Sequence, residues 1–305
     1  MEQTVFSRKD GTKAYLKDGV FTVEGGDLLF SAYKTFDCGQ CFRWERLPDG
    51  SFEGVVMGRV LSLRENENGF SVLDVFGSVD VHLAEFLVNY FDLQTCYSAC
   101  NETISRDDNV AAKAVEAGRG IRLLRQELFE TVISFIISAN NNIPRIKKCI
   151  ARLCALCGEK LGTRCGKDYY AFPESESILA FSPDEIQELA GVGYRAPFIR
   201  QTASLFAEGT YSLKKLLDCG SPESLNKALL ALPGVGEKVA GCVTLFAGLD
   251  RGAFPVDVWV ERMCRELYGL DGLTRTALEK EMKSRFGENS GLAQQYLFYY
   301  IRSIH

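Results

Sequence analysis

The hydrophobic pattern of this chain changes its period near residue 108, and that change constrains the fold more than any other feature. From residue 15 to residue 76, short apolar runs alternate with turn signals such as Asn68–Gly69, which is typical of antiparallel strands. From about residue 108, apolar residues recur three and four positions apart, as in 123–137, which is typical of helices. We therefore predict an α+β protein, with an antiparallel β-sheet domain over residues 1–107 and an all-helical domain over residues 108–305.

Charge is distributed unevenly between these two regions. The 305-residue chain has a net charge of −5, which by itself argues against a nucleic-acid partner. Residues 1–107 hold 10 Lys and Arg against 17 Asp and Glu, whereas residues 108–305 hold 25 against 23, so the acidity belongs to the predicted sheet. Only two histidines occur, His82 and His305. A histidine-centred triad, or a metal site with several histidine ligands, is therefore nearly excluded.

The eleven cysteines are expected to be reduced thiols. The chain has neither a secretory signal nor an apolar stretch of transmembrane length, so we expect a cytoplasmic protein, associated with the nucleoid if bacterial, without a membrane partner. Cys38 with Cys41, and Cys154 with Cys157, have the spacing of zinc half-sites. The stronger interpretation is that they are small apolar side chains, because Cys154 and Cys157 lie on an apolar helical face.

Two similar Gly-Val-Gly turns occur in the helical region, at Gly191–Arg195 and Gly234–Lys238. Each follows a helix start marked by a Ser before a Pro, at Ser182 and Ser221, and each precedes another apolar helix. Both turns therefore predict short helix hairpins, the second at about residues 221–250. Tight connections through glycine explain the two turns without any function.

The second turn also has features of an anion site. Gly234 and Gly236 allow positive φ and close backbone approach. The next helix begins with free N–H groups, including that of Val239, and such a helix end binds a phosphate. It can grip a DNA backbone without reading sequence, so the local positive end matters more than the net charge.

Lys238 and Asp257 are the candidate reactive pair. Lys238 lies in the first turn of the second hairpin helix, where the helix dipole disfavours a cation. It is either an exposed lysine that contacts phosphate or a partly neutral amine that attacks an electrophilic carbon to form a Schiff base. Asp257 is either a helix cap without a catalytic role or the counter-charge for an oxocarbenium-like sugar when an N-glycosidic bond breaks.

Five motifs, taken in order, resemble those of the 8-oxoguanine DNA glycosylases, which are bifunctional base-excision enzymes with a helix-hairpin-helix, a Gly/Pro-rich loop and an aspartate. The motifs are CGQCFRW at 38–44, ISFIISANNNIPR at 133–145, GVGYRA at 191–196, LPGVGEKVA at 232–240 followed by PVD at 255–257, and GLAQQYLF at 291–298. The hairpin alone would name only the superfamily, whereas the five together are specific. The resemblance implies a helix-hairpin-helix glycosylase domain that flips 8-oxoguanine paired with cytosine out of duplex DNA, excises it and nicks the strand by β-elimination.

The resemblance implies the chemical roles in the base pocket. Lys238 would attack the sugar C1′ carbon, and Asp257 would be the essential carboxylate. The carbonyl of Gly39 would accept a hydrogen bond from the N7–H that 8-oxoguanine has and guanine lacks. Taken singly, Gly39 is better explained as a turn glycine.

Four more side chains complete the implied pocket. Cys242 and Phe298 would sandwich the flipped base, and Gln294 would bind its Watson–Crick edge. Phe246 would lie at the pocket edge, where the family usually has a methionine. The alternatives are core residues for Cys242 and Phe298 and a surface amide for Gln294.

The DNA interface is also implied by the resemblance. Asn140 would fill the space left by the flipped base, Tyr194 would wedge into the stack, and Arg145 and Arg195 would hold the estranged cytosine. Asn140 is otherwise a helix C-cap and Tyr194 a packing residue. The backbone amides that would grip phosphate are those around Gly234, Gly236, Lys238 and Val239.

This sequence departs from the family pattern at several positions. Trp259 occupies a DNA-binding position where eukaryotic members usually carry a phosphate-contacting histidine, and Cys38 and Cys41 stand where serines are usual. No redox cofactor or catalytic metal is required, although a structural monovalent or divalent cation is possible in the hairpin. Its ligands would be the carbonyls of Leu230, Leu232 and Val235. We expect a monomer whose partner is double-stranded DNA containing 8-oxoguanine.

Two other functions remain open from the sequence. One is a monofunctional glycosylase for alkylated bases, against which Lys238 argues. The other is a non-catalytic helix-hairpin-helix module that only binds DNA.

Overall fold

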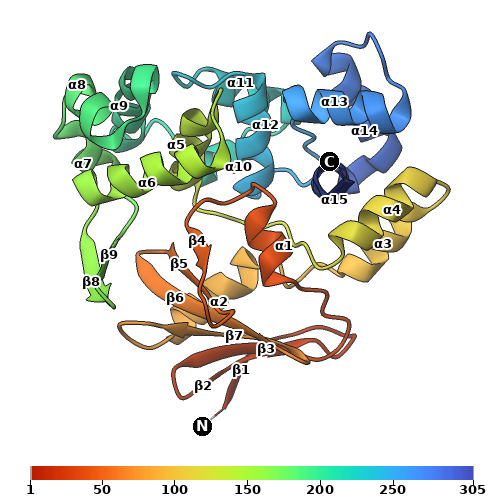
Figure 1. The fold of residues 1–305 in the computed structure, drawn as a ribbon, viewed down its shortest axis with the longest axis horizontal. Coiled ribbons are helices and arrows are strands. Elements are labelled where there is room, and N and C mark those ends of the chain that lie inside the picture. Colours follow the sequence, from red (N-terminus) through yellow and green to blue (C-terminus); the bar gives the residue numbers. More distant parts are fainter. Residues whose placement is uncertain (1, 305) are drawn as a thin grey trace.

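The computed structural model describes residues 2–304; His305, one of the two histidines, lies outside this range. A strand-rich layer lies below a set of helices (Figure 1). The α+β prediction is therefore confirmed. The seven antiparallel strands follow the order β1-β2-β3-β7-β6-β5-β4. They are β1 (Gln3–Ser7), β2 (Lys13–Lys17), β3 (Val20–Glu24), β4 (Trp44–Arg46), β5 (Phe52–Val56), β6 (Arg59–Asn66) and β7 (Gly69–Asp74).

Alternating side chains give this sheet one buried face. Phe21 and Val23 of β3 are fully buried, as are Leu61 and Leu63 of β6, in agreement with the two-residue period of a strand. Helix α2 (Val81–Tyr90) contributes Leu83 and Leu87 to the same core.

Helices begin earlier than the pattern predicted. Three precede residue 108: α1 (Ala32–Asp37), α2 and α3 (Tyr97–Ser105). Helix α1 begins at the N-cap Ser31, and the chain then turns at Gly39 before entering β4. This turn places Gly39 between the sheet and the helices.

The helical part is not all-helical, because it also contains a β-hairpin. Strands β8 (Lys160–Arg164) and β9 (Lys167–Tyr170) pair in an antiparallel arrangement beside α6. The helices are α4 (Asn109–Gly118), α5 (Leu128–Ser138), α6 (Ile143–Cys157), α7 (Ser175–Leu179), α8 (Pro183–Glu185), α9 (Ala196–Ala207), α10 (Leu213–Leu217), α11 (Pro222–Leu230), α12 (Glu237–Phe246), α13 (Val258–Tyr268), α14 (Arg275–Phe286) and α15 (Ser290–Ile304). A π-helical segment Ile186–Ala190 and 3₁₀ turns Gly193–Arg195 and Gly287–Asn289 complete them.

The helix starts predicted at Ser182 and Ser221 are confirmed, since both residues are side-chain N-caps followed by Pro. The helix predicted over 123–137 begins only at Leu128. The N–H groups of Leu124, Arg125 and Gln126 bond instead to Gln40 Oε1 and to the carbonyls of Tyr90 and Phe246. Tertiary partners therefore keep this stretch extended.

Two large hydrophobic cores of the described residues meet at that stretch, and a small third cluster contains Val55, Val60 and Tyr169. The core under the sheet consists of residues up to Leu93, together with Leu124. The helical core consists of residues from Tyr97 onward, together with Cys38 and Phe42 from the loop after α1. A domain boundary at 107/108 stays a prediction. Among the described residues, no helix is long and apolar enough to cross a membrane.

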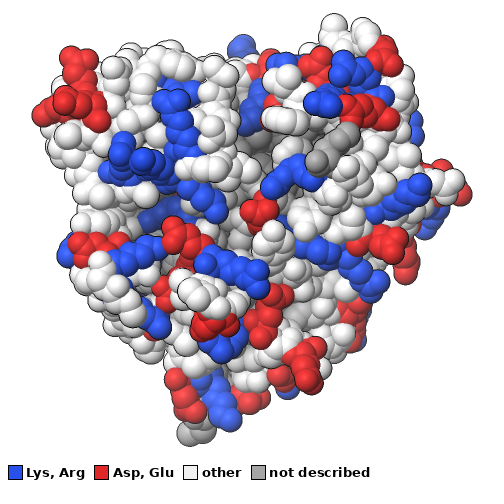
Figure 2. Space-filling model, in the orientation of Figure 1, with Lys and Arg blue, Asp and Glu red and all other residues white. Residues whose placement is uncertain are grey.

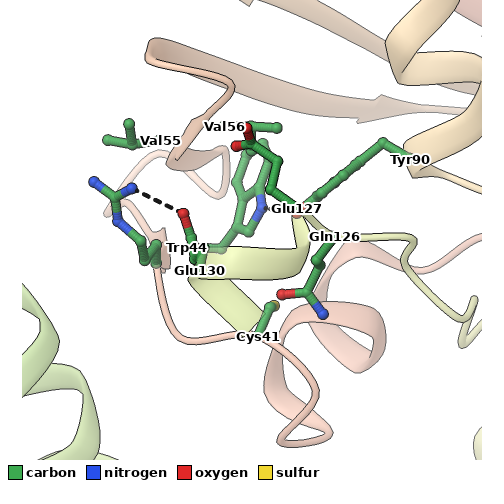
Figure 3. A pocket seen from close by; sticks show the side chains of 9 residues that line it. Cys41, Trp44, Val55, Val56, Tyr90, Gln126, Glu127 and Glu130 are labelled. Atoms are coloured by element: carbon green, nitrogen blue, oxygen red, sulfur yellow. Dashed lines mark hydrogen bonds and ion pairs between the residues drawn. The ribbon is translucent and has the colours of Figure 1, made fainter. Parts of the chain in front are cut away.

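A partly buried ion pair connects the loop before β4 to the start of α5. Arg43 forms an ion pair with Glu130 at 3.2 Å and also donates to the carbonyl of Tyr170. Figure 3 shows Glu130 and Glu127 of this junction close to Trp44, whose Nε1 donates to the Tyr90 hydroxyl at 2.9 Å. Burial raises the pKa of the Glu130 carboxyl, which the Arg43 guanidinium opposes. The junction thus sets the position of α5, whose other end reaches the candidate site.

Candidate active site

Helices α11 and α12 form the predicted hairpin, and its two glycines differ. Gly234 has φ +79°, and a Cβ there would lie 2.8 Å from Phe198 Cβ, so only glycine fits. Gly236 has φ −98°, so the expected positive φ is wrong there; it is the extended N-cap of α12. A Cβ on Gly236 would meet nothing within 4 Å, and no side chain caps α12. The helix end is therefore open, as an anion site requires.

Lys238 is the second residue of α12 and is half-buried. Its Nζ donates to Ser138 Oγ at 3.0 Å and lies 5.2 Å from the centre of the Phe135 ring. The Ser138 hydroxyl donates in turn to the Phe135 carbonyl at 2.8 Å, so its oxygen is free to accept from Lys238. These contacts hold the amine at the end of α5 through a neutral partner. No ion pair joins Lys238 to a carboxylate within residues 2–304.

Asp257 is the N-cap of α13, as its position suggested. Its Oδ1 accepts from the N–H groups of Trp259 and Val260 at 3.0 and 2.9 Å. The other oxygen, Oδ2, has no hydrogen-bond donor within the described chain. One carboxylate oxygen therefore caps α13, while the other stays available to a ligand.

Both residues line one pocket of about 530 Å³. Its walls come from the loop after α1, from α5, α6, α12 and α13, and from α15. All predicted catalytic and base-pocket residues are among its lining: Gly39, Lys238, Cys242, Phe246, Asp257, Gln294 and Phe298. Segments more than 200 residues apart thus converge, and the pocket is large enough for a purine base, since ligand pockets typically measure 300–1,000 Å³.

The turn at Gly39 is held rigidly by its neighbour Gln40. Gly39 has φ +85°, in the region that favours glycine. The fully buried Gln40 side chain donates to the carbonyls of Thr35 and Arg122 at 2.9 and 2.8 Å and accepts from Leu124 N–H at 2.9 Å. Its own carbonyl accepts from the Gln126 side chain at 2.7 Å. The peptide that carries the Gly39 carbonyl is therefore fixed before any ligand arrives.

The remaining pocket side chains form apolar and amide walls. Cys242 is buried, and burial raises the pKa of its thiol to about 11, which keeps it neutral beside Lys238. Phe246 stacks on Phe135 with ring centres 5.3 Å apart. Gln294 is only 5% exposed, so the surface-amide alternative is wrong. Phe298, which is partly exposed, lies 5.7 Å from the guanidinium of Arg302.

A second group of predicted residues gathers outside the pocket lining. Asn140 has φ +49° just after α5, and Tyr194 is 58% exposed. The buried Arg195 connects them, because it donates to the carbonyls of Ala139, Asn140 and Val192 and lies 4.4 Å from the Tyr194 ring. Its guanidinium is therefore committed to backbone carbonyls in this state.

The exposed face of α6 is basic. Arg145, Lys148 and Arg152 are exposed at three- and four-residue spacing on α6. Figure 2 shows Lys and Arg side chains on the upper left of this view and around its hollowed centre. Trp259 lines the pocket but is 62% exposed, so its ring is available at the pocket entrance.

The described residues of this pocket do not bring three His, Cys, Asp or Glu ligand groups together as a metal centre would. Within residues 2–304, only Asp10, Asp27 and Cys96 bring three candidate ligand groups together, and they lie in the sheet part with Arg8 already bound to Asp10. In the predicted hairpin, the Leu232 carbonyl accepts from Val235 N–H at 3.1 Å and retains a second lone pair. A cation held there with the Leu230 and Val235 carbonyls stays a prediction.

Several residues at this pocket were not predicted from the sequence. Ser138 and Phe135 belong to the motif at 133–145 but are separated from Lys238 by about one hundred residues, so only the fold pairs them. Gln295 also lines the pocket, and its spacing of three from Phe298 and seven from Arg302 is a helical signal that could have indicated it.

Comparison with known proteins assigns both parts of the chain to families. Residues 26–132 match the family described as 8-oxoguanine DNA glycosylase, N-terminal domain, and residues 133–288 match the HhH-GPD superfamily base excision DNA repair proteins. The N-glycosylase/DNA lyase OGG1 of Arabidopsis thaliana is 31% identical over 281 residues, covering 87% of this chain and 75% of that protein. The N-glycosylase/DNA lyase of Saccharomyces cerevisiae is 32% identical over 274 residues, covering 83% and 71%.

Solved structures agree with this assignment. The 8-oxoguanine glycosylase/lyase of Clostridium acetobutylicum, solved with double-stranded DNA containing cytosine opposite 8-oxoguanine, superposes with a TM-score of 0.85 at 33% identity, covering 100% of this chain and 98% of that one. A 3-methyladenine DNA glycosylase from Archaeoglobus fulgidus, at 20% identity and a TM-score of 0.65, shares the fold alone. The chain therefore belongs to the 8-oxoguanine DNA glycosylase family of the HhH-GPD superfamily.

Proposed function

We propose that this protein excises 8-oxoguanine paired with cytosine from duplex DNA and then nicks the strand through a Schiff base at Lys238. The observation that carries the proposal is the convergence of Lys238 and Asp257 in one purine-sized pocket with the base-pocket residues. The glycosylase/lyase relatives support both steps of the reaction. Lys238 argues against an alkylated-base enzyme that lacks the lyase step.

The chemistry follows from the placement of these two groups. A base flipped into the pocket brings its sugar near Lys238, whose Nζ is held by the neutral Ser138 hydroxyl and thus is not tied up in an ion pair. The neutral amine attacks C1′, and the C1′–N9 bond breaks with its electron pair leaving on the base. The departing base takes up the proton that the attacking nitrogen loses. The Asp257 carboxylate stabilises the positive charge that develops on the sugar. The C1′–O4′ bond then breaks and O4′ takes up a proton, which gives an iminium at Lys238. Loss of a proton from C2′ to solvent breaks the C3′–O bond, and the 3′ phosphate leaves with the electron pair of that bond.

Base recognition would rest on the Gly39 carbonyl. Because Gln40 fixes that peptide, its carbonyl is an acceptor whose position does not adapt to the base. The N7–H of 8-oxoguanine would satisfy it, whereas guanine would leave it unpaired, and an unpaired buried acceptor costs about 1–3 kcal/mol. Phe298 and Cys242 would enclose the base.

The DNA itself would be held by neutral and basic groups around the pocket. The open N-terminus of α12, at Gly236 and Val239, would bind a phosphate. Asn140 and the exposed Tyr194 would replace the flipped base, and Arg145 and Arg195 would face the estranged cytosine. For Arg195 this requires release of at least one carbonyl contact. We propose that the protein acts as a monomer.

A nicking assay tests this function. Duplexes carrying 8-oxoguanine opposite each of the four bases are incubated with excess protein, and a matched guanine–cytosine duplex serves as the control. We expect strand cleavage at 8-oxoguanine, fastest opposite cytosine, and none at guanine. Release of methylated adenine without nicking would instead indicate an alkylated-base glycosylase. Equal cleavage opposite all four bases would contradict the roles given to Arg145 and Arg195.

A further inference from the structure

Helix α6 carries four basic residues and no acidic one, in a chain whose net charge is −5. Three of them, Arg145, Lys148 and Arg152, are exposed, and their spacing of three and four residues places them on one face of the helix. The fourth, Lys147, faces the sheet part instead, because its Nζ donates to the Trp44 carbonyl at 3.3 Å. The three exposed residues form what we call the α6 basic face.

Within residues 2–304, the α6 basic face has no carboxylate partner, since none of its three side chains takes part in an ion pair. The β8–β9 hairpin beside α6 differs, because Lys160, Arg164 and Lys167 each pair with a carboxylate. Like charges four residues apart destabilise a helix, so the fold gains nothing from Lys148 and Arg152. The face is therefore available to an anionic partner outside the chain.

The two ends of the α6 basic face lie beside two parts of the proposed DNA interface. At one end, the first turn of α6 lines the pocket through Ile143 and Ile146. At the other end, a Cβ on Gly191 would lie 3.1 Å from Arg152 Nη1, so Arg152 lies against the first Gly-Val-Gly hairpin, which carries the exposed Tyr194. Figure 2 shows Lys and Arg side chains gathered where Figure 1 draws α6, next to the hollowed centre. The face therefore continues from the pocket rim to the first hairpin.

We propose that the α6 basic face binds phosphates of the complementary strand, the strand that carries the cytosine opposite 8-oxoguanine. The inference rests on the proposed function, in which Arg145 faces that cytosine. Lys148 and Arg152 follow Arg145 on the same face, and the three Cα atoms span about 10 Å at the helical rise of about 1.5 Å per residue. One strand of duplex DNA carries about three phosphates over that length, so the three charges match a continuous stretch of backbone.

The lesion strand is bound by a different helix, α12. Lys238 reaches the lesion nucleotide from the second position of α12, so the open N-terminus of that helix lies beside the lesion strand. Both α6 and α12 contribute walls to the pocket, so a duplex whose base enters the pocket meets both helices. An acidic protein could match the charge of the α6 basic face, but it gives no reason for that face to begin at the pocket rim. This continuity favours duplex DNA.

Removal of two charges tests the α6 basic face. The variant combines Lys148→Gln with Arg152→Gln. The matched control combines Lys113→Gln with Arg106→Gln, which removes one lysine and one arginine from exposed positions at α4 and at the end of α3, on the opposite side of the molecule in Figure 1. Binding of an undamaged duplex is measured by fluorescence anisotropy between 50 and 200 mM salt, because phosphate contacts carry no sequence information.

The salt dependence gives the expected result. Each phosphate contact contributes about −0.9 to the slope of the logarithm of the binding constant against the logarithm of the salt concentration. The slope of Lys148→Gln with Arg152→Gln should therefore be shallower than that of wild type by about 1.8. Its affinity at 50 mM salt should be at least about tenfold weaker, and the deficit should shrink as salt rises because wild type loses affinity more steeply. The control pair should keep the wild-type slope and affinity.

A second measurement identifies the strand. The duplex carries a tetrahydrofuran residue opposite cytosine, an abasic analogue that cannot form a Schiff base, so the protein binds in one register without cleavage. The phosphates beside the cytosine are replaced by neutral methylphosphonates, on one side and then on the other. On one of these sides, the replacement should weaken wild-type binding at least about tenfold and binding of the Lys148→Gln, Arg152→Gln variant less than about twofold. The same replacement in the lesion strand should weaken both proteins alike.

Three results would overturn the inference. An unchanged salt slope in Lys148→Gln with Arg152→Gln would leave the face to another anionic partner or to solvent. An equal change in the control pair would show an effect of net charge alone. Equal losses for wild type and the variant on the neutral complementary strand would place the phosphate contacts elsewhere. If the binding results hold but wild type does not cleave at 8-oxoguanine, only the proposed function fails, so the two failures are distinguishable.

Discussion

The two Gly-Val-Gly hairpins have similar sequences but use their basic side chains differently. In the first, Gly191 and Gly193 both have positive φ, and Arg195 is buried against three backbone carbonyls. In the second, Gly234 has positive φ, and Lys238 binds one hydroxyl and lines the pocket. The two basic residues occupy the same position relative to their turns.

The contrast follows from the chemistry of the two side chains. A guanidinium has five donors in a fixed fork and stays charged, so it suits a cluster of carbonyls. A lysine amine has a single nitrogen that becomes a nucleophile when it loses a proton. The first hairpin therefore orders the segment Ala139–Asn140 after α5, and the second presents the amine of the proposed nucleophile, Lys238, from the start of α12.

The strongest way to break this comparison is to remove the amine. Lys238→Gln keeps a polar side chain that can reach Ser138 but has no nucleophile, so we expect the single-turnover nicking rate to fall at least about a thousandfold. Lys227→Gln, on the exposed face of α11, is the matched control and should keep the wild-type rate. Substantial nicking by Lys238→Gln would assign the nucleophile elsewhere.

Asp257→Asn tests the charge separately from the helix cap. Asparagine caps helices as well as aspartate, so the hydrogen bonds to the N–H groups of Trp259 and Val260 can persist and Tm should change little. Loss of the carboxylate charge should lower the excision rate by about 10²–10³-fold. Excision at the wild-type rate would show that Asp257 is only a cap.

Arg195→Met and Lys238→Met should differ in stability. Removing the Arg195 guanidinium takes the side-chain donor away from the carbonyls of Ala139, Asn140 and Val192, which should cost about 2–4 kcal/mol of unfolding free energy. Lys238 loses its hydrogen bond to Ser138 and a weak one with the Cys242 thiol, so its replacement should cost less than about 1.5 kcal/mol. Urea unfolding measures both, and equal costs would remove the distinction between a structural and a reactive hairpin.

The two turn glycines should respond differently to an added methyl group. Gly234→Ala combines an unfavourable φ with a contact against Phe198, so we expect a loss of about 1–3 kcal/mol. Gly236→Ala has open space and an ordinary φ, so the loss should stay below about 1 kcal/mol. Phosphate contact at this open helix end would appear as weaker duplex binding by Gly236→Ala without a matching change in stability.

The smallest expected effect concerns the thiol beside Lys238. Burial raises the pKa of Cys242 to about 11, so at pH 8 it is almost entirely a thiol and should be alkylated slowly. The exposed Cys165 is the internal comparison. Because the thiolate is the reactive form, the rate constant for alkylation of Cys242 should still rise as the pH is raised from 9 to 10. Rapid modification at pH 8 would contradict a buried neutral thiol.

The sequence indicated Lys238 and Asp257 as the candidate reactive pair because the signals at both positions are local, and their catalytic roles stay a prediction. Lys238 follows a glycine turn directly, and Asp257 precedes an amphipathic helix, so neighbouring residues define both positions. Ser138 and Gln295 were missed because their partners come from tertiary contacts or from a spacing that only the pocket makes meaningful.

The fold was predicted in outline for the same reason. The strand alternation in 15–76 is local, whereas the β8–β9 hairpin turns through Cys165 and Gly166, at φ +50° and +75°, without an Asn-Gly or Asp-Gly signal. The stretch before α5 has an apolar helical period, but Gln40, Tyr90 and Phe246 take its N–H groups. Tertiary hydrogen bonds there override the local pattern.

Borohydride trapping tests the central claim, that Lys238 forms the Schiff base, most directly. Wild-type protein, Lys238→Gln and Lys227→Gln are incubated with a duplex carrying 8-oxoguanine opposite cytosine, and borohydride reduces any imine to a stable covalent complex. The structure predicts a protein–DNA adduct for wild type and Lys227→Gln, with the reduced linkage mapped to Lys238, and no adduct for Lys238→Gln. No adduct with wild type, or an adduct that persists in Lys238→Gln, would contradict it.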